Sequence, residues 1–95
     1  DRILKNHPSD HNAQFYRAMC YHHLLDYNRS INLLTPVAND PNNPFMEDAM
    51  FYLAQSYANT GNRTPAINLY NNIIQNNNNF RKQAKEELRR IEGGK

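Results

Sequence analysis

The sequence contains four histidines, a residue type that often binds metal ions. His7 and His11 are four residues apart, and His22 and His23 are adjacent. A zinc site needs three or four converging ligands. His7 and His11 flank a proline and the start of a predicted helix, so they do not share one clear helical face. The pattern favours solvated histidines, and we expect neither a metal ion nor a cofactor.

Two further groups could do catalytic chemistry. Cys20 could be a nucleophile beside the histidines, and Glu47 with Asp48 could be a general acid–base pair. An internal alignment places Ser56 opposite Cys20, which indicates that the position needs a small residue, so we interpret Cys20 as a buried structural cysteine. The two acids directly precede Ala49 in the first turn of a predicted helix, where negative charge complements the helix dipole. The sequence therefore does not predict an enzyme.

Charged residues are too sparse in the centre of the chain for a nucleic-acid-binding surface. The only charged residue between Ala49 and Phe80 is Arg63. Nucleic-acid-binding proteins concentrate Lys and Arg where the phosphates lie, so we expect no nucleic-acid partner. No polybasic anchor and no apolar run of roughly 18 residues is present, so we expect no direct membrane contact from this segment. Because the sequence begins without Met, we expect it to be part of a longer protein, and the compartment stays open.

An internal repeat in the sequence predicts the helices that position these residues. Shifting the chain by 36 residues aligns residues 13–40 with residues 49–76, and eight of the 28 pairs are identical. The identical residues in the first copy are Ala13, Phe15, Tyr16, Ala18, Tyr21, Ile31, Asn32 and Leu33. In each copy the apolar residues recur at helical spacing in two segments separated by a turn. Each copy therefore predicts a pair of helices.

Individual residues also indicate where the turns of these helix pairs lie and where the helices cross. Asp26 and Asn62 are suited to cap the second helix of each pair, and Gly61 provides the backbone freedom of a tight turn. Ala18, Ala54 and Ala66 lie where close helix crossing would exclude larger residues. Pro36 lies inside a predicted helix, where proline removes a hydrogen bond and clashes with the preceding turn. We therefore predict a kink or break near residues 32–36.

The second copy resembles the tetratricopeptide repeat, whose pattern is an aromatic residue, Leu-Gly, Tyr, a turn Gly, Ala, a second aromatic residue and Pro. The matching residues are Met50, Leu53, Ala54, Tyr57, Gly61, Ala66, Tyr70 and, in place of Pro, Asn78. The first copy matches at Ala18 and Tyr21, with Ser30 in place of Ala and Leu34 in place of the second aromatic residue. The resemblance implies an all-α fold, a right-handed superhelix of antiparallel helix pairs.

The resemblance also suggests the domain organisation. We expect a single domain over residues 1–92. Its parts are the tail of a preceding repeat at 1–8, a first repeat at 11–40, a second repeat at 45–78, a capping helix at 80–92 and a tail at 93–95. In the last helix Phe80, Ala84, Leu88 and Ile91 form one narrow apolar stripe among charged residues. Solenoids need such a polar cap.

The family resemblance implies a protein-interaction scaffold that binds a peptide or partner protein on its concave face, which is lined by the first helix of each pair. The residues expected there are Asn12, Phe15, Met19, His22, His23, Asp48, Phe51, Gln55, Ala58, Asn59, Lys82, Lys85 and Arg89. Phe15, Met19 and Phe51 make this face suited to an apolar or helical peptide, because such residues supply most hot-spot energy.

Two other functions remain open at this point. Residues 39–45 and 84–88 are similar to the C-terminal arrays of bacterial membrane-anchored tetratricopeptide proteins, which would make the chain a structural or oligomerisation segment of a larger protein. An enzyme accessory domain using Cys20, His22 or His23 is the other alternative. It would need convergent polar groups in a pocket, and the sequence shows none.

Overall fold

The structure is a computed structural model that describes residues 11–76 and 79–93, and this part of the chain contains five helices and no strand. The helices are α2 (His11–His23), α3 (Tyr27–Ala38), α4 (Met46–Asn59), α5 (Arg63–Asn76) and α6 (Arg81–Gly93). The all-α fold is confirmed. The tail of a preceding repeat expected at residues 1–8, together with His7, lies outside the described residues.

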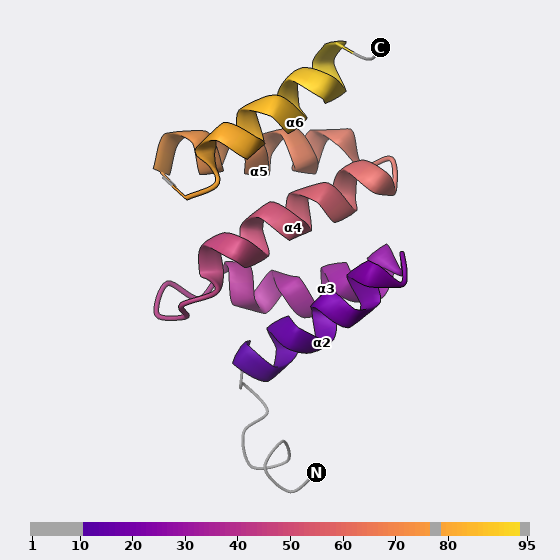
Figure 1. Cartoon of the computed structure of the whole chain (residues 1–95), viewed down its shortest axis with the longest axis vertical. Coiled ribbons are helices and arrows are strands. Elements are labelled where there is room, and N and C mark those ends of the chain that lie inside the picture. Colours follow the sequence, from indigo (N-terminus) through magenta and orange to yellow (C-terminus); the bar gives the residue numbers. More distant parts are fainter. Residues whose placement is uncertain (1–10, 77–78, 94–95) are drawn as a thin grey trace, which may run out of the picture.

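The helices follow one another along the long axis of the molecule (Figure 1), which measures 47 × 26 × 18 Å. α3 packs against both α2 and α4, and α5 packs against both α4 and α6. In Figure 1, α2, α4 and α6 slant in the same direction, and α3 and α5 return between them. Contacts mainly between neighbours in sequence are typical of a solenoid.

Two apolar clusters hold the stack together, and α4 contributes to both. The first cluster, from α2, α3 and α4, contains Phe15, Ala18, Leu34, Val37, Ala38, Ala49 and Leu53. The second, from α4, α5 and α6, contains Phe51, Ala54, Ala66, Tyr70, Ile73 and Ala84. Ala18, Ala54 and Ala66 are completely buried, as expected of alanines between packed helices.

The turns within the two helix pairs have the same backbone geometry. Asp26 N–H donates to the Tyr21 carbonyl at 2.9 Å, and Leu25 N–H donates to the His22 carbonyl at 3.0 Å. The α4–α5 turn repeats both bonds 36 residues later, around Gly61. This pattern is the Schellman motif, in which the residue after the helix takes a positive φ. Gly61 has φ +82° and Leu25 has φ +62°, a conformation that costs an L-residue roughly 1–2 kcal/mol.

Asp26 caps α3 as predicted, because its carboxylate accepts from Arg29 N–H at 3.3 Å. Asn62 precedes α5, but its side-chain amide donates to the Thr60 hydroxyl at 2.9 Å. Glu47 and Asp48 lie in the first turn of α4, which confirms their interpretation as helix-start residues.

The break predicted near Pro36 is wrong, because α3 continues through it to Ala38. Pro36 lies in the last turn of the helix, so the hydrogen bond lost to the missing N–H is close to the helix end. The preceding residue, Thr35, donates its hydroxyl to the Ile31 carbonyl at 2.7 Å, which adds a bond to the same turn. A bend of the helix axis stays a prediction.

The interpretation of Cys20 as a buried residue is also wrong, because its side chain is exposed. Its counterpart Ser56 is completely buried. The difference has a physical reason: α4 is packed on two sides, by α3 and α5, whereas α2 packs mainly on α3 among the described helices. Equivalent positions in a solenoid are therefore buried to different degrees in its different repeats.

Candidate functional site

The phenylalanines expected on the concave face lie in the core instead. Phe15 and Phe51 are each 7% exposed. Phe15 stacks on Phe45 with ring centroids 4.7 Å apart, and Phe51 stacks on Phe80 at 4.9 Å. Each pair joins the first helix of one unit to the segment that begins the next unit. The expected display of Phe15 and Phe51 to a partner is therefore corrected: both rings are occupied by the fold.

The neighbouring tyrosines have the more exposed position. Tyr16 is 60% exposed, and its ring lies edge-on to Phe15 at 6.0 Å and to Phe45 at 5.4 Å. Tyr52 is half-buried and lies edge-on to Phe51 at 5.5 Å. A tyrosine combines an apolar ring with a hydroxyl that prefers water, which suits the boundary between core and surface. Tyr16 and Tyr52 are thus added to the surface residues of α2 and α4.

His22 is the best-defined polar side chain between the two helix pairs. Its ring lies edge-on to Tyr27 of α3 at 5.5 Å and to Tyr52 of α4 at 5.3 Å. Its Nδ1 is 3.5 Å from the hydroxyl of buried Ser56, also in α4. Burial, together with the adjacent His23, lowers the pKa of His22. A neutral imidazole can accept a hydrogen bond from Ser56 and pack against both tyrosine rings.

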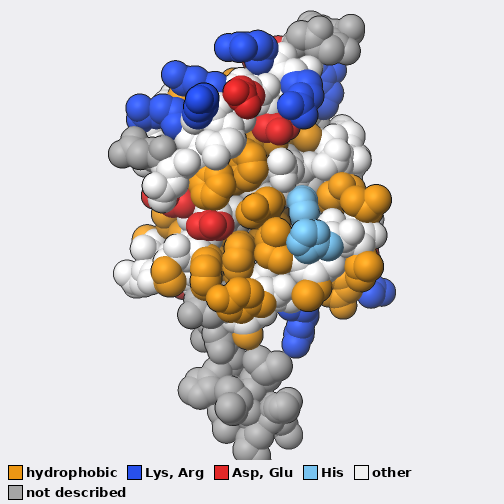
Figure 2. Space-filling view, viewed as in Figure 1, with side chains coloured by type: hydrophobic (Ala, Val, Ile, Leu, Met, Phe, Trp, Pro, Cys, Tyr) orange, Lys and Arg blue, Asp and Glu red, His pale blue; other side chains and the backbone are white. Residues whose placement is uncertain are grey.

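The other residues of α2 and α4 that were predicted for the concave face are at least partly accessible to solvent. Met19, Asp48, Gln55 and Ala58 are half-buried, and His23 and Asn59 are exposed. The backbone of Asn12 is in α2, but its side chain lies outside the described residues. Figure 2 shows histidine side chains as a pale blue patch with orange hydrophobic side chains beside it. This surface is predominantly apolar and carries few charges.

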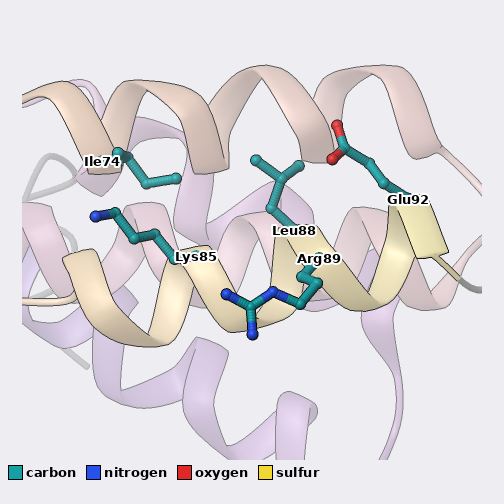
Figure 3. A pocket seen from close by; sticks show the side chains of 5 residues that line it. All are labelled: Ile74, Lys85, Leu88, Arg89 and Glu92. Carbon is teal, nitrogen blue, oxygen red and sulfur yellow. The ribbon is translucent and has the colours of Figure 1, made fainter.

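The predicted lysines of α6 lie apart from that patch. Lys82 is exposed, and Lys85 lines a cleft of about 460 Å³ between α5 and α6. Figure 3 shows this cleft, with Ile74 coming from α5 and the other side chains from α6. Leu88 and Ile74 form its apolar part, whereas Arg89 extends away from α5. The apolar area is small, and the charges around it belong to α6.

Asn59 lines a second cleft, of about 420 Å³, between the α4–α5 turn and the end of α6. Arg63 donates across this cleft to the Ile91 carbonyl at 3.1 Å, which ties the last turn of α6 to the start of α5. Arg90 and Glu87 form an ion pair of 3.6 Å at its edge. Arg63 therefore joins α6 to the preceding unit, whereas Arg90 is paired within α6.

The residues that the structure describes were predicted to hold no metal ion, and their possible metal ligands and acids are placed as follows. Within this part of the chain, no three His, Cys, Asp or Glu side chains gather as metal ligands. Glu47, half of the possible acid pair, accepts from the Asn79 amide at 2.5 Å. None of the helices described is long and apolar enough to span a bilayer.

Comparison with known proteins identifies the architecture. The family model described as tetratricopeptide repeat matches residues 48–77, which contain most of α4 and all of α5. No curated protein and no solved structure matches the chain. The matched residues form one helix pair, and α2 and α3 repeat that pair with the same turn geometry. Residues 48–77 thus match a tetratricopeptide repeat, and the all-helical repeat around them is consistent with that architecture, which supports a generic protein–protein interaction module.

Proposed function

We propose that this chain binds a peptide or a segment of a partner protein across the surface formed by α2 and α4. We define this surface, the α2–α4 face, by Met19, His22, His23, Tyr52, Gln55 and Asn59. The observation that carries the proposal is the contact of His22 with Tyr52 and Ser56, which makes one continuous surface from two repeats. A binding site shared between repeats is rigid only where the repeats pack directly on one another.

The chemistry of this face favours an apolar segment with few charges. Met19 offers an adaptable apolar side chain, and Tyr52 offers a rigid ring with a hydroxyl. Gln55 and Asn59 provide amides that can pair with the backbone of an extended or helical segment. Arg63 is the only charged residue between Ala49 and Phe80, so salt should affect binding weakly. Phe15 and Phe51 contribute indirectly, because their stacks hold α2 and α4 in position.

The proposal can be tested with a double variant, Met19→Glu with Gln55→Glu. Both side chains are partly buried, and Met19 also packs against the first cluster, so the variant places two charges on the α2–α4 face and its retained helicity is checked first. Affinity for the partner recovered with the wild type should fall at least about tenfold, as for hot-spot residues. The matched control is Asn68→Glu with Gln75→Glu, on exposed positions of α5. Equal affinity for both double variants would refute the assignment.

A further inference from the structure

A third cleft lies between α2 and α3, and two arginines line it. Its volume is about 210 Å³, which suits one side chain rather than a folded element. Arg17 and Tyr21 come from α2, and Arg29, Asn32 and Leu33 come from α3. These lining residues include two cationic groups and no acid, so the cleft attracts an anion.

Arg29 is held in position in the wall of this cleft. Its guanidinium carbon lies 5.4 Å from the centroid of the Tyr21 ring, a cation–π contact that joins α3 to α2. Its Nε is 3.5 Å from the Asp26 carboxylate. These contacts leave the two terminal Nη groups without an ion-pair partner among the described residues. A guanidinium fixed in this way loses little freedom when it binds an anion.

Arg17 supplies the second positive charge of the cleft. Its side chain is exposed and forms no ion pair with the residues that the structure describes. The equivalent residue of the second repeat is Leu53, which is 5% exposed and belongs to the first cluster. Packing therefore favours an apolar side chain at this position, and the arginine is not required by it.

The rest of the cleft is common to both repeats. The residue types at positions 21, 32 and 33 recur 36 residues later as Tyr57, Asn68 and Leu69. Only the two arginines are replaced, Arg17 by Leu53 and Arg29 by Pro65. Both cationic groups are thus specific to the first repeat, and both line the same cleft.

We propose that this cleft binds the carboxylate of a glutamate side chain on an acidic segment of a partner protein. Arg17 and Arg29 carry two positive charges, and Asp26 compensates one of them, which leaves an excess of one. A single carboxylate balances that excess. A phosphate monoester carries roughly −1.5 to −2 charges at pH 7 and would exceed it.

The uncharged lining residues suit the rest of a glutamate side chain. The Asn32 amide can donate a further hydrogen bond to the carboxylate. Leu33 and the ring of Tyr21 can pack against the methylene groups. Arg17 and Tyr21 are each two residues from Met19, a rotation of about 200° around α2. The cleft is therefore on the opposite side of α2 from Met19 and is separate from the α2–α4 face.

Other anionic partners fit this cleft less well. Nucleic acids and anionic membranes are bound by several Lys and Arg side chains together. Arg17 and Arg29 are the only Lys or Arg residues of α2 and α3. A second copy of this chain would have to offer an acid, and the exposed acids among the described residues are Glu86 and Glu92. Both lie on α6 within one turn of Arg89, so their docking would bring like charges together.

Nuclear magnetic resonance titration of the 95-residue chain tests this assignment. The probe is an acetylated and amidated hexapeptide of alternating glutamate and alanine, and the control peptide has glutamine in place of glutamate. We expect the glutamate peptide to shift the Nε–H resonances of Arg17 and Arg29 and the side-chain amide of Asn32 until they saturate. The glutamine peptide should leave them unchanged. Equal shifts with both peptides, no saturable shift, or tighter binding of inorganic phosphate would overturn the proposal.

The double variant Arg17→Gln with Arg29→Gln removes both charges and keeps the backbone N–H that Asp26 caps. It should weaken binding of the glutamate peptide about tenfold. The matched control, Lys82→Gln with Arg89→Gln, removes two charges from exposed positions of α6 and should bind as the wild type does. Equal losses in the two double variants would indicate attraction by net charge alone and overturn the proposal. If circular dichroism shows lost helicity in the first double variant, Arg17→Gln alone should weaken binding about threefold, and unchanged binding would overturn the proposal.

Sedimentation equilibrium distinguishes a glutamate of a partner protein from one of a second copy. We expect the wild type and the double variant Arg17→Gln with Arg29→Gln to have the same mass across the protein concentrations of the titration. A wild-type dimer that the double variant does not form would place a second copy in the cleft and overturn the proposal.

Discussion

Ser30 offers the sharpest single-residue test of the packing. It is completely buried in α3, and its hydroxyl has no hydrogen-bond partner among the residues described. The equivalent residue of the second repeat is Ala66, which is also completely buried. The two repeats therefore place a serine and an alanine in matching environments. Ser30→Ala removes only the unpaired hydroxyl.

The expected size of the effect follows from three contributions. An unpaired buried hydroxyl costs about 1–3 kcal/mol. Alanine also has a higher helix propensity than serine, by roughly 0.5 kcal/mol. Losing the oxygen atom removes a few dispersion contacts of about 0.1–0.2 kcal/mol each. Ser30→Ala should therefore raise the free energy of unfolding by about 1–2 kcal/mol, a large share of the stability of a small domain.

Urea unfolding followed by far-ultraviolet circular dichroism measures this change. If the slope is about 2 kcal/mol/M and is unchanged, the midpoint should rise by about 0.5–1 M. The reciprocal variant, Ala66→Ser, should lower the midpoint by a comparable amount, because it buries a hydroxyl in the second repeat. A lower or unchanged midpoint for Ser30→Ala would refute the reasoning and imply that the hydroxyl has a partner.

Three further predictions follow from the structure. Asp26→Ala should lower the free energy of unfolding by about 1 kcal/mol in the same urea assay, because Arg29 N–H loses its capping carboxylate; no loss would exclude a capping role. Phe51→Ala should lower the free energy of unfolding by about 3–5 kcal/mol, because the ring packs against Phe80 in the second cluster. A smaller loss for Phe51→Ala than for Met50→Ala would contradict this prediction. Burial and His23 lower the pKa of His22, so the folded state binds this proton more weakly than the unfolded state. The free energy of unfolding should be highest above the ordinary pKa of 6.5 and should fall as the pH drops below that value. The variant His22→Gln should lose this part of the pH dependence.

Local sequence signals predicted the helices, the turns and the alanine crossings. Each of these depends on residues within one or two helical turns, or on a repeat that the sequence displays directly. Asp26 could be recognised as a cap because capping needs only its own side chain and the next three residues. Gly61 could be recognised because a positive φ is a property of one residue. Such features are determined locally, and the fold preserves them.

The orientation of the aromatic residues could not be predicted in the same way. Phe15 and Tyr16 are adjacent, so helical periodicity alone does not decide which ring faces inward. Phe15 faces the core because it stacks on Phe45, which lies 30 residues later in the sequence. The recurrence of phenylalanine at positions 45 and 80 was visible in the sequence and would have indicated this pairing. The tyrosine hydroxyls gave a second signal, because they disfavour full burial.

The charges on α6 explain why a further helix would pack poorly on its outer side. Aligning Ala84 with Ala49 places Lys85, Arg89 and Glu92 opposite Met50, Ala54 and Tyr57. Ala54 is completely buried in the cluster shared with α5, whereas Arg89 is exposed beside a cleft. A helix approaching α6 as α5 approaches α4 would have to bury the guanidinium of Arg89 without a partner, which is strongly unfavourable. This substitution of charge for alanine supports the capping role that we propose for α6.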